Sequence, residues 1–192
     1  SQSKLVDEIY CAPGNAGIAE FAKCVPIKTS DFEGLADFAQ EENIDLTIVG
    51  MDEPLVNGIV DVFEERGLAV FGPNKRAAIL EGSKAFSKDL MKKYNIPSAG
   101  YETFTDANKA MAYIEECKFP IVLKADGLCL GKGVLICETK QEALDGIKSI
   151  MLDKQFGAAG ETLVIEEFLV GKEVSVLAFC DGKTVKAMTS AQ

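Results

Sequence analysis

The chain has 192 residues, of which 47% are hydrophobic and 26% charged, a balance typical of a globular protein with one large or two small domains. Its 30 acidic side chains outnumber the 20 basic ones, and the net charge of -10 disfavours non-specific binding to nucleic acid or to an anionic membrane. Histidine is absent from the sequence, which excludes Ser–His and Cys–His nucleophilic pairs and histidine metal ligands.

The first part of the chain, residues 1–78, alternates strand and helix signals with short loops, which indicates a doubly wound α/β unit with a parallel sheet. Ser30 and Glu33 have the spacing of a capping box, so we expect Ser30 to cap a helix. Ligands of such sheets bind at the carboxyl ends of strands, where the turns at 14–17 and 50–53 fall. The predicted strands cover 6–13, 45–49 and 68–71, and a second predicted helix covers 55–66.

Helical signals dominate residues 79–118, which we expect to link the first part of the chain to the last. Residues 119–192 have the pattern of a small α+β domain. Asp181-Gly182 is a hairpin-turn signal between the last two predicted strands. From residue 77 onward we predict helices over 77–80, 83–94, 107–117 and 141–152, and strands over 101–104, 121–125, 133–137, 163–167, 172–180 and 183–188.

Residues 119–136 are predicted to form a buried strand, a glycine-rich loop and a second strand. The loop is not a P-loop, because three residues rather than four separate Gly127 from Gly131, and a glycine rather than Ser or Thr follows Lys132. Its glycines let backbone amides approach an anion, and Lys124 at the strand end is a candidate phosphate ligand. The alternative interpretation is an ordinary flexible hairpin loop beside a snorkelling lysine.

Two further motifs carry charged side chains. Lys84 lies in the first turn of a predicted helix, where a cation is mildly unfavourable unless an anion is bound nearby. In the run 163–176, a strand end is suited to hold an adenine through backbone groups, with Glu173 placed to reach the ribose hydroxyls. The alternative for this run is an amphipathic strand pair with solvated carboxylates.

The cysteines and the lack of targeting signals indicate a cytoplasmic protein. Six cysteines form no C-x-x-C pair, and several lie in apolar runs, so we expect free, buried, reduced thiols. The first residues lack the apolar core of a signal peptide, and no apolar run approaches the ~20 residues that a membrane span needs.

The motifs EGSKAFSK around Lys84, KADGLCLGKGV from Lys124 onward, and VIEEFL occur in an order that resembles the ATP-grasp ligases, which sandwich ATP between two α+β subdomains. APGNAG (12–17) and FGP (71–73) are similar specifically to the phosphoribosylamine–glycine ligase family. The resemblance implies a parallel-sheet unit followed by an ATP-grasp subdomain. It also implies that glycine is joined to 5-phosphoribosylamine in purine synthesis, with ATP activating the glycine carboxylate as an acyl phosphate.

The same resemblance implies roles for individual residues. The loop 126–133 would close over ATP as a lid and exclude water. The residues implied in ATP binding are Lys84, Lys124, Asp126, Gly127, Gly131, Lys132, Gly133, Glu166, Glu167, Phe168, Leu169 and Glu173. Those implied on the phosphoribosylamine side are Gly14, Asn15, Ala16, Gly17, Asp52 and Glu53. Family members hold Mg²⁺ or Mn²⁺ with Glu and Asn side chains that we expect past Gln192, so no metal ligand is expected in this chain.

The sequence also departs from the family pattern. Met51 stands where the family turn has proline, and Cys129 and Leu130 replace small residues of the loop. Family members begin with a strand and a G-N-G-G-R turn, which we expect before Ser1 in a longer, monomeric parent. We therefore expect these residues alone to bind ATP weakly and to be inactive in ligation. Another ATP-grasp ligase and a non-catalytic ATP-binding module are the alternative functions.

Overall fold

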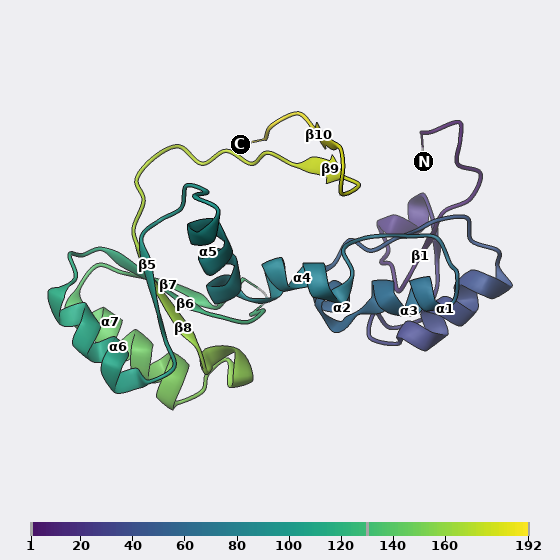
Figure 1. The fold of residues 1–192 in the computed structure, drawn as a ribbon. Coiled ribbons are helices and arrows are strands. Elements are labelled where there is room, and N and C mark those ends of the chain that lie inside the picture. The colour runs from purple at the N-terminus through teal and green to yellow at the C-terminus, as the bar shows by residue number, and fades with distance from the viewer. Residues whose placement is uncertain (1, 130, 192) are drawn as a thin grey trace.

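The structure is a computed structural model that describes residues 2–129 and 131–191. Within these ranges the chain folds into two parts with separate hydrophobic cores, linked by helix α4 (Lys75–Gly82) (Figure 1). The predicted fold class is confirmed, since parallel strand pairs precede a four-stranded α+β unit. No helix in the described ranges is both long and apolar enough to span a bilayer.

The described residues of the first part form two short pairs of parallel strands, β1–β2 and β3–β4, three α-helices and a 3₁₀ helix over Ile18–Glu20. Its core lies between α1 and α3, where Ala36, Val60 and Phe63 are almost completely buried. The elements are β1 (Tyr10–Cys11), β2 (Lys23–Cys24), α1 (Phe32–Glu41), β3 (Thr47–Ile48), α2 (Asp52–Asn57), α3 (Ile59–Glu65) and β4 (Val70–Phe71).

The strands predicted over 6–13, 45–49 and 68–71 are present only as the two-residue strands β1, β3 and β4. Two further predictions for this part are wrong. Asp31 rather than Ser30 caps α1, because its carboxylate accepts a hydrogen bond from Gly34 N at 3.0 Å. The single helix predicted over 55–66 is two helices, since Gly58 has φ +98° and ends α2 in the left-handed conformation. Its apolar positions therefore belong to two short helices.

The second part is an antiparallel sheet in the strand order β5–β8–β6–β7, flanked by helices. Strands β6 and β8 have the predicted bounds. The elements are α5 (Lys84–Lys93), β5 (Tyr101–Phe104), α6 (Ala107–Tyr113), β6 (Ile121–Ala125), β7 (Val134–Cys137), α7 (Lys140–Ile147) and β8 (Leu163–Glu167). The predicted helix 141–152 ends as a π-helical turn over Lys148–Leu152, and the helix predicted over 107–117 ends in a 3₁₀ turn over Ile114–Glu116.

The two faces of this sheet differ in character. Helices α6 and α7 cover one face, and Leu123 and Ile165 are buried beneath them (Figure 1). Because side chains alternate across a strand, Lys124 and Glu166 belong to the opposite face. Helix α5 lies on that opposite side (Figure 1), where Val164 is buried, and the face is open only at β7, where Val134 and Ile136 are exposed.

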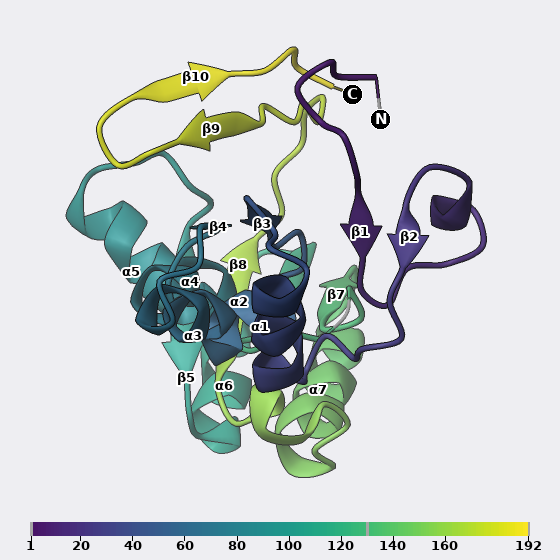
Figure 2. The same ribbon diagram turned by 90° about the vertical axis from the view of Figure 1, so that its right-hand side faces the viewer.

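A hairpin of β9 (Ala178–Cys180) and β10 (Val185–Ala187) ends the described chain. Both strands are shorter than predicted. The Asp181 carboxylate accepts from the backbone N–H groups of Lys183 and Thr184 and holds these residues in the turn, so β10 begins only at Val185. The hairpin stands apart from both cores, on the side of the molecule where the two termini lie (Figure 2). An aromatic contact with the first part joins the rings of Phe179 and Phe71, whose centroids are 5.9 Å apart.

The cysteines are free thiols, but their burial varies. Cys137 is buried as predicted, whereas Cys24 and Cys180 are exposed and contradict the expectation. Cys24 lies on the edge strand β2, and Cys180 lies on a hairpin that no other layer covers.

Candidate functional site

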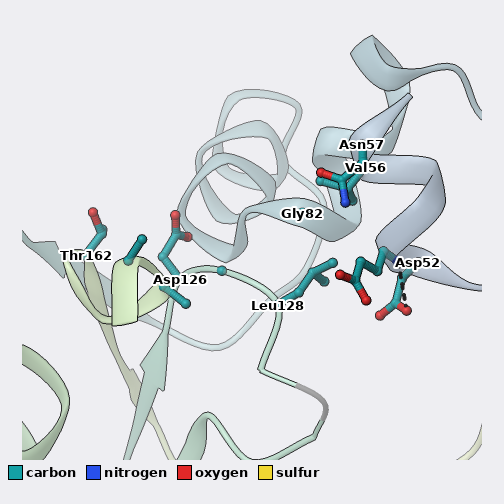
Figure 3. A pocket seen from close by; sticks show the side chains of 11 residues that line it. Asp52, Val56, Asn57, Gly82, Asp126, Leu128 and Thr162 are labelled. Atoms are coloured by element: carbon teal, nitrogen blue, oxygen red, sulfur yellow. Dashed lines mark hydrogen bonds between the residues drawn. The ribbon is translucent and has the colours of Figure 1, made fainter. Parts of the chain in front are cut away.

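A cavity of about 530 Å³ lies between α2 and the start of the loop that follows β6 (Figure 3). It brings together Asp52 and Glu53, predicted on the substrate side, with Asp126 and Gly127, predicted on the nucleotide side. The cavity is lined by Asp52, Glu53, Val56, Asn57, Gly82, Asp126, Gly127, Leu128, Ala158, Ala159 and Thr162.

Asp52 and Glu53 form the first turn of α2, where negative charge is favourable at a helix N-terminus. Asp52 Oδ1 accepts from Glu53 N at 3.1 Å, and both side chains are exposed. The α2 wall of the cavity therefore presents two solvated carboxylates.

The carboxylate of Asp126 is held at the N-terminus of α5. It accepts from Ala85 N at 2.7 Å, and both of its oxygens lie 3.1 Å from Ser83 Oγ. Ser83 in turn caps the helix by accepting from Phe86 N at 3.1 Å. The anion that the Lys84 position favours is therefore the carboxylate of Asp126, which belongs to the chain itself.

Lys84 binds the first two residues of the glycine-rich loop, Asp126 and Gly127. Its ammonium donates to Gly127 O at 2.9 Å and to Asp126 O at 3.4 Å. Gly127 has a packing role here, because a Cβ at this position would lie 2.8 Å from Ala159 Cβ. Helix α5 and the loop are therefore joined by backbone and side-chain contacts.

The remaining described residues of the loop lead from Gly127 to strand β7. Gly131 has φ +77°, which favours glycine, and Gly133 O accepts from Ala125 N at 2.8 Å. Lys132 is exposed, with its backbone N–H bonded to Cys129 O. The departure noted at Leu130 lies outside the described residues.

A second cluster of charges lies on the α5 side of the sheet. Glu166 is 5% exposed, and its Oε2 is 2.9 Å from Lys124 Nζ and 3.0 Å from Lys88 Nζ. Lys124 and Glu166 are diagonal neighbours, because Lys124 pairs with Val164 and Val122 pairs with Glu166. The ammonium of Lys124 is thus paired with a carboxylate rather than surrounded by water.

The other predicted residues of the second part differ in their surroundings. Glu167 is tied to the start of β5, since it accepts from Gly100 N at 2.9 Å. Phe168 and Leu169 are exposed beyond the end of β8. Glu173 is exposed on the stretch that leads to β9.

The glycine-rich turn at 14–17 lies in the first part and contributes no residue to the lining of the cavity. Asn15 Oδ1 accepts from Ile18 N at 3.0 Å, which stabilises the turn. Gly14 has φ +74°, and a Cβ there would lie 2.4 Å from Cys24 Sγ. This turn is the carboxyl end of β1, as predicted.

Two family models together match the whole chain. The N domain of phosphoribosylglycinamide synthetase matches residues 1–81, and its ATP-grasp (A) domain matches residues 82–192. The chain belongs to the phosphoribosylglycinamide synthetase family. The resemblance seen in the sequence motifs is therefore confirmed.

Relatives in this synthetase family share about half of their residues with the chain. It is 50% identical over 192 residues to a phosphoribosylamine–glycine ligase of Halalkalibacterium halodurans, and 48% identical over 192 residues to one of Clostridium acetobutylicum. All of the chain is matched, together with 45% and 46% of these relatives. A crystal structure of phosphoribosylamine–glycine ligase from Thermotoga maritima has a TM-score of 0.77 and 32% identity, covering 97% of this chain and 44% of that one. The chain thus spans about half the length of these relatives.

Lys88 of helix α5 was not among the residues predicted from the sequence, although it belongs to the charged cluster around Glu166. It is 7% exposed, and its ammonium binds Glu166, Ser98 Oγ at 2.7 Å and Ala99 O at 3.5 Å. The spacing in the sequence could have indicated its position, because Lys88 lies four residues after Lys84 and therefore on the same face of α5. Lysine is rarely buried, so the pattern alone favours a solvated position.

Proposed function

We propose that this chain forms the phosphoribosylamine-binding part and the first half of the ATP-binding part of an enzyme that joins glycine to 5-phosphoribosylamine, converting ATP to ADP and phosphate. The observation that carries the proposal is the match of the two synthetase domains, in order, to residues 1–192. The proposal concerns the longer protein of this family, of whose relatives the chain spans 45% to 46%.

The charges on the α5 side of the sheet support a bound nucleotide. Two lysines share one carboxylate, so the cluster of Lys88, Lys124 and Glu166 carries an excess positive charge that suits a phosphate oxygen. Lys124 is the more accessible of the two cations, with 28% of its side chain exposed. It is therefore the phosphate ligand in this proposal.

The remaining nucleotide contacts in this proposal follow from the resemblance of each motif to the ATP-grasp ligases. Lys132 reaches the phosphates from the loop 126–133, which closes as a lid. Lys84 contacts a phosphate after leaving the carbonyl of Gly127. The residues Glu166, Glu167, Phe168 and Leu169 border the adenine, and Glu173 binds the ribose.

The cavity and the turn after β1 serve the other two substrates. Carboxylates attract amino groups and repel phosphates, so Asp52 and Glu53 suit the amino group of glycine or of phosphoribosylamine. The phosphate of phosphoribosylamine instead suits the backbone amides of the turn Gly14, Asn15, Ala16 and Gly17. A phosphorylated substrate does not cross membranes unaided, so the proposal places the enzyme in the cytoplasm.

No step is assigned to Mg²⁺ or Mn²⁺. Among residues 2–129 and 131–191, no three Cys, Asp or Glu side chains come together as a possible metal site. A divalent ion, when bound by such ligases, neutralises the phosphates of ATP. The described residues fit the nucleotide better than they fit this ion.

The test is ADP release by the longest natural polypeptide that carries this sequence. We expect ADP only when glycine, phosphoribosylamine and ATP are all present, and none when alanine replaces glycine. ADP release that does not depend on glycine or on phosphoribosylamine would contradict the proposal.

Variants then separate the two sides of the site. Lys124→Met should raise the KM for ATP at least tenfold, a loss of about 1.4 kcal/mol. The matched control is Lys118→Met, an exposed lysine before β6. Asp52→Asn with Glu53→Gln should raise the KM of glycine or of phosphoribosylamine and leave the KM for ATP unchanged.

A further inference from the structure

Lys88 and Lys124 contact the same oxygen of Glu166 but differ in their other surroundings. Lys88 is 7% exposed and also donates to Ser98 Oγ at 2.7 Å. Lys124 has 28% of its side chain exposed, and its ammonium makes its one hydrogen bond in the described structure to Glu166. Lys88 is therefore a fixed partner of Glu166, whereas Lys124 is able to turn toward solvent or a ligand.

The burial of Glu166 makes this difference important. Its Oε1 is buried without a hydrogen-bond partner in the described structure, so Oε2 carries all of its pairing. A buried carboxylate that loses its last cation costs several kcal/mol. With Lys88 present, Lys124 can leave Glu166 and the carboxylate still has a paired ammonium at 3.0 Å.

We propose that Lys88 is a positioning residue that keeps Glu166 neutralised, so that the ammonium of Lys124 is available to a phosphate of the bound nucleotide. This inference rests on the proposed function and identifies a residue outside the predicted site. Lys88 touches no phosphate itself and acts through Glu166. Without Lys88, Glu166 holds Lys124, and each nucleotide that binds has to break the last ion pair of a buried carboxylate.

A purely structural role predicts a different pattern. Lys88 also anchors α5 to the segment before β5 through Ser98 and Ala99. If that anchor were its whole function, removing the charge of Glu166 would not restore the ATP binding that is lost when Lys88 is replaced. If Lys88 is a positioning residue, Glu166→Gln restores ATP binding, because a neutral amide no longer retains the ammonium of Lys124.

The test is calorimetric titration of ATP into the longest natural polypeptide that carries this sequence. We expect Lys88→Met to weaken ATP binding at least tenfold, and Lys88→Arg, which keeps the charge, to stay within about threefold of the parent, or about 0.7 kcal/mol. The double variant Lys88→Met/Glu166→Gln should bind ATP within about threefold of Glu166→Gln alone. Parent-like binding by Lys88→Met, or a double variant as weak as Lys88→Met, would overturn the inference.

A second measurement needs no nucleotide. Acylation of Lys124 by an amine-reactive reagent, followed by peptide mass spectrometry, reports how firmly Glu166 holds its ammonium. We expect slower labelling in Lys88→Met than in the parent, and recovery in the double variant. Lys88→Gln, which can still hydrogen-bond to Ser98, replaces Lys88→Met if that variant does not fold.

The two measurements also separate this inference from the proposed function. A parent that binds no ATP would contradict the proposed nucleotide site, and the labelling of Lys124 would then decide the inference alone. Equal labelling of Lys124 in the parent and in the Lys88 variant would overturn it.

Discussion

Replacing Asp126 by alanine removes the carboxylate that fixes the start of α5 to the end of β6. The variant loses the hydrogen bond from Ala85 N at 2.7 Å and the contacts with Ser83 Oγ at 3.1 Å. The backbone bond from Lys84 N to Asp126 O and the Ser83 cap on Phe86 N are unaffected. The perturbation is therefore confined to one partly buried carboxylate.

The magnitude follows from the contacts that are lost. A capping side chain contributes about 0.5–2 kcal/mol, and a negative charge at a helix N-terminus about 0.3–1 kcal/mol. Because Ser83 still caps α5, we expect Asp126→Ala to lower the free energy of unfolding by about 2 kcal/mol. Asp126→Asn keeps an acceptor oxygen and loses only the charge, so about 1 kcal/mol is expected.

Urea unfolding followed by circular dichroism measures the effect. With a slope of about 2 kcal/mol per molar urea, Asp126→Ala should lower the midpoint by about 1 M. Asp153→Ala is the matched control, because Asp153 is exposed and its side chain makes no hydrogen bond in the described structure. A midpoint for Asp126→Ala equal to that of the control would refute the reasoning.

Three further predictions concern stability and reactivity. Gly58→Ala should cost about 1 kcal/mol or more in urea unfolding because φ is +98° there, whereas Gly50→Ala, with open space around it, should be near neutral. A hydrogen bond to a carboxylate raises the pKa of Tyr101 from 10.0 to about 12, so its contribution to stability is complete below pH 10 and lost between pH 10 and 12. Absorbance titration and the stability of Tyr101→Phe against pH check this. Burial raises the pKa of the Cys137 thiol, so a disulfide reagent should label exposed Cys24 in the folded chain and Cys137 only after unfolding.

The sequence predicted some elements well for physical reasons that are visible in their residues. Strands β6 and β8 were predicted with the observed bounds, because each begins with three consecutive apolar residues, 121–123 and 163–165. The break at Gly58 was missed, because the apolar positions on both sides keep a helical spacing. The break depends on tertiary packing, because α2 packs against α4 whereas α3 packs against α1.

The site was predictable as separate motifs and not as an arrangement. The motifs around Asp52 and Asp126 were both found, but their meeting in one cavity depends on packing between segments that are distant in the sequence. The burial of the Glu166 side chain was likewise not predicted, since it follows from the cover that α5 provides. Family resemblance suggested which residues matter, and the structure shows which of them bind one another.

The hairpin of β9 and β10 has a consequence for the order of folding. Its strands are too short to be stable alone, and the chain segment between Phe71 and Phe179 contains the whole four-stranded sheet. Closing so long a loop costs entropy that one aromatic contact offsets only in part. The hairpin should therefore dock last during folding and detach first, so proteases should cut the segment between β8 and β9 before they cut either core.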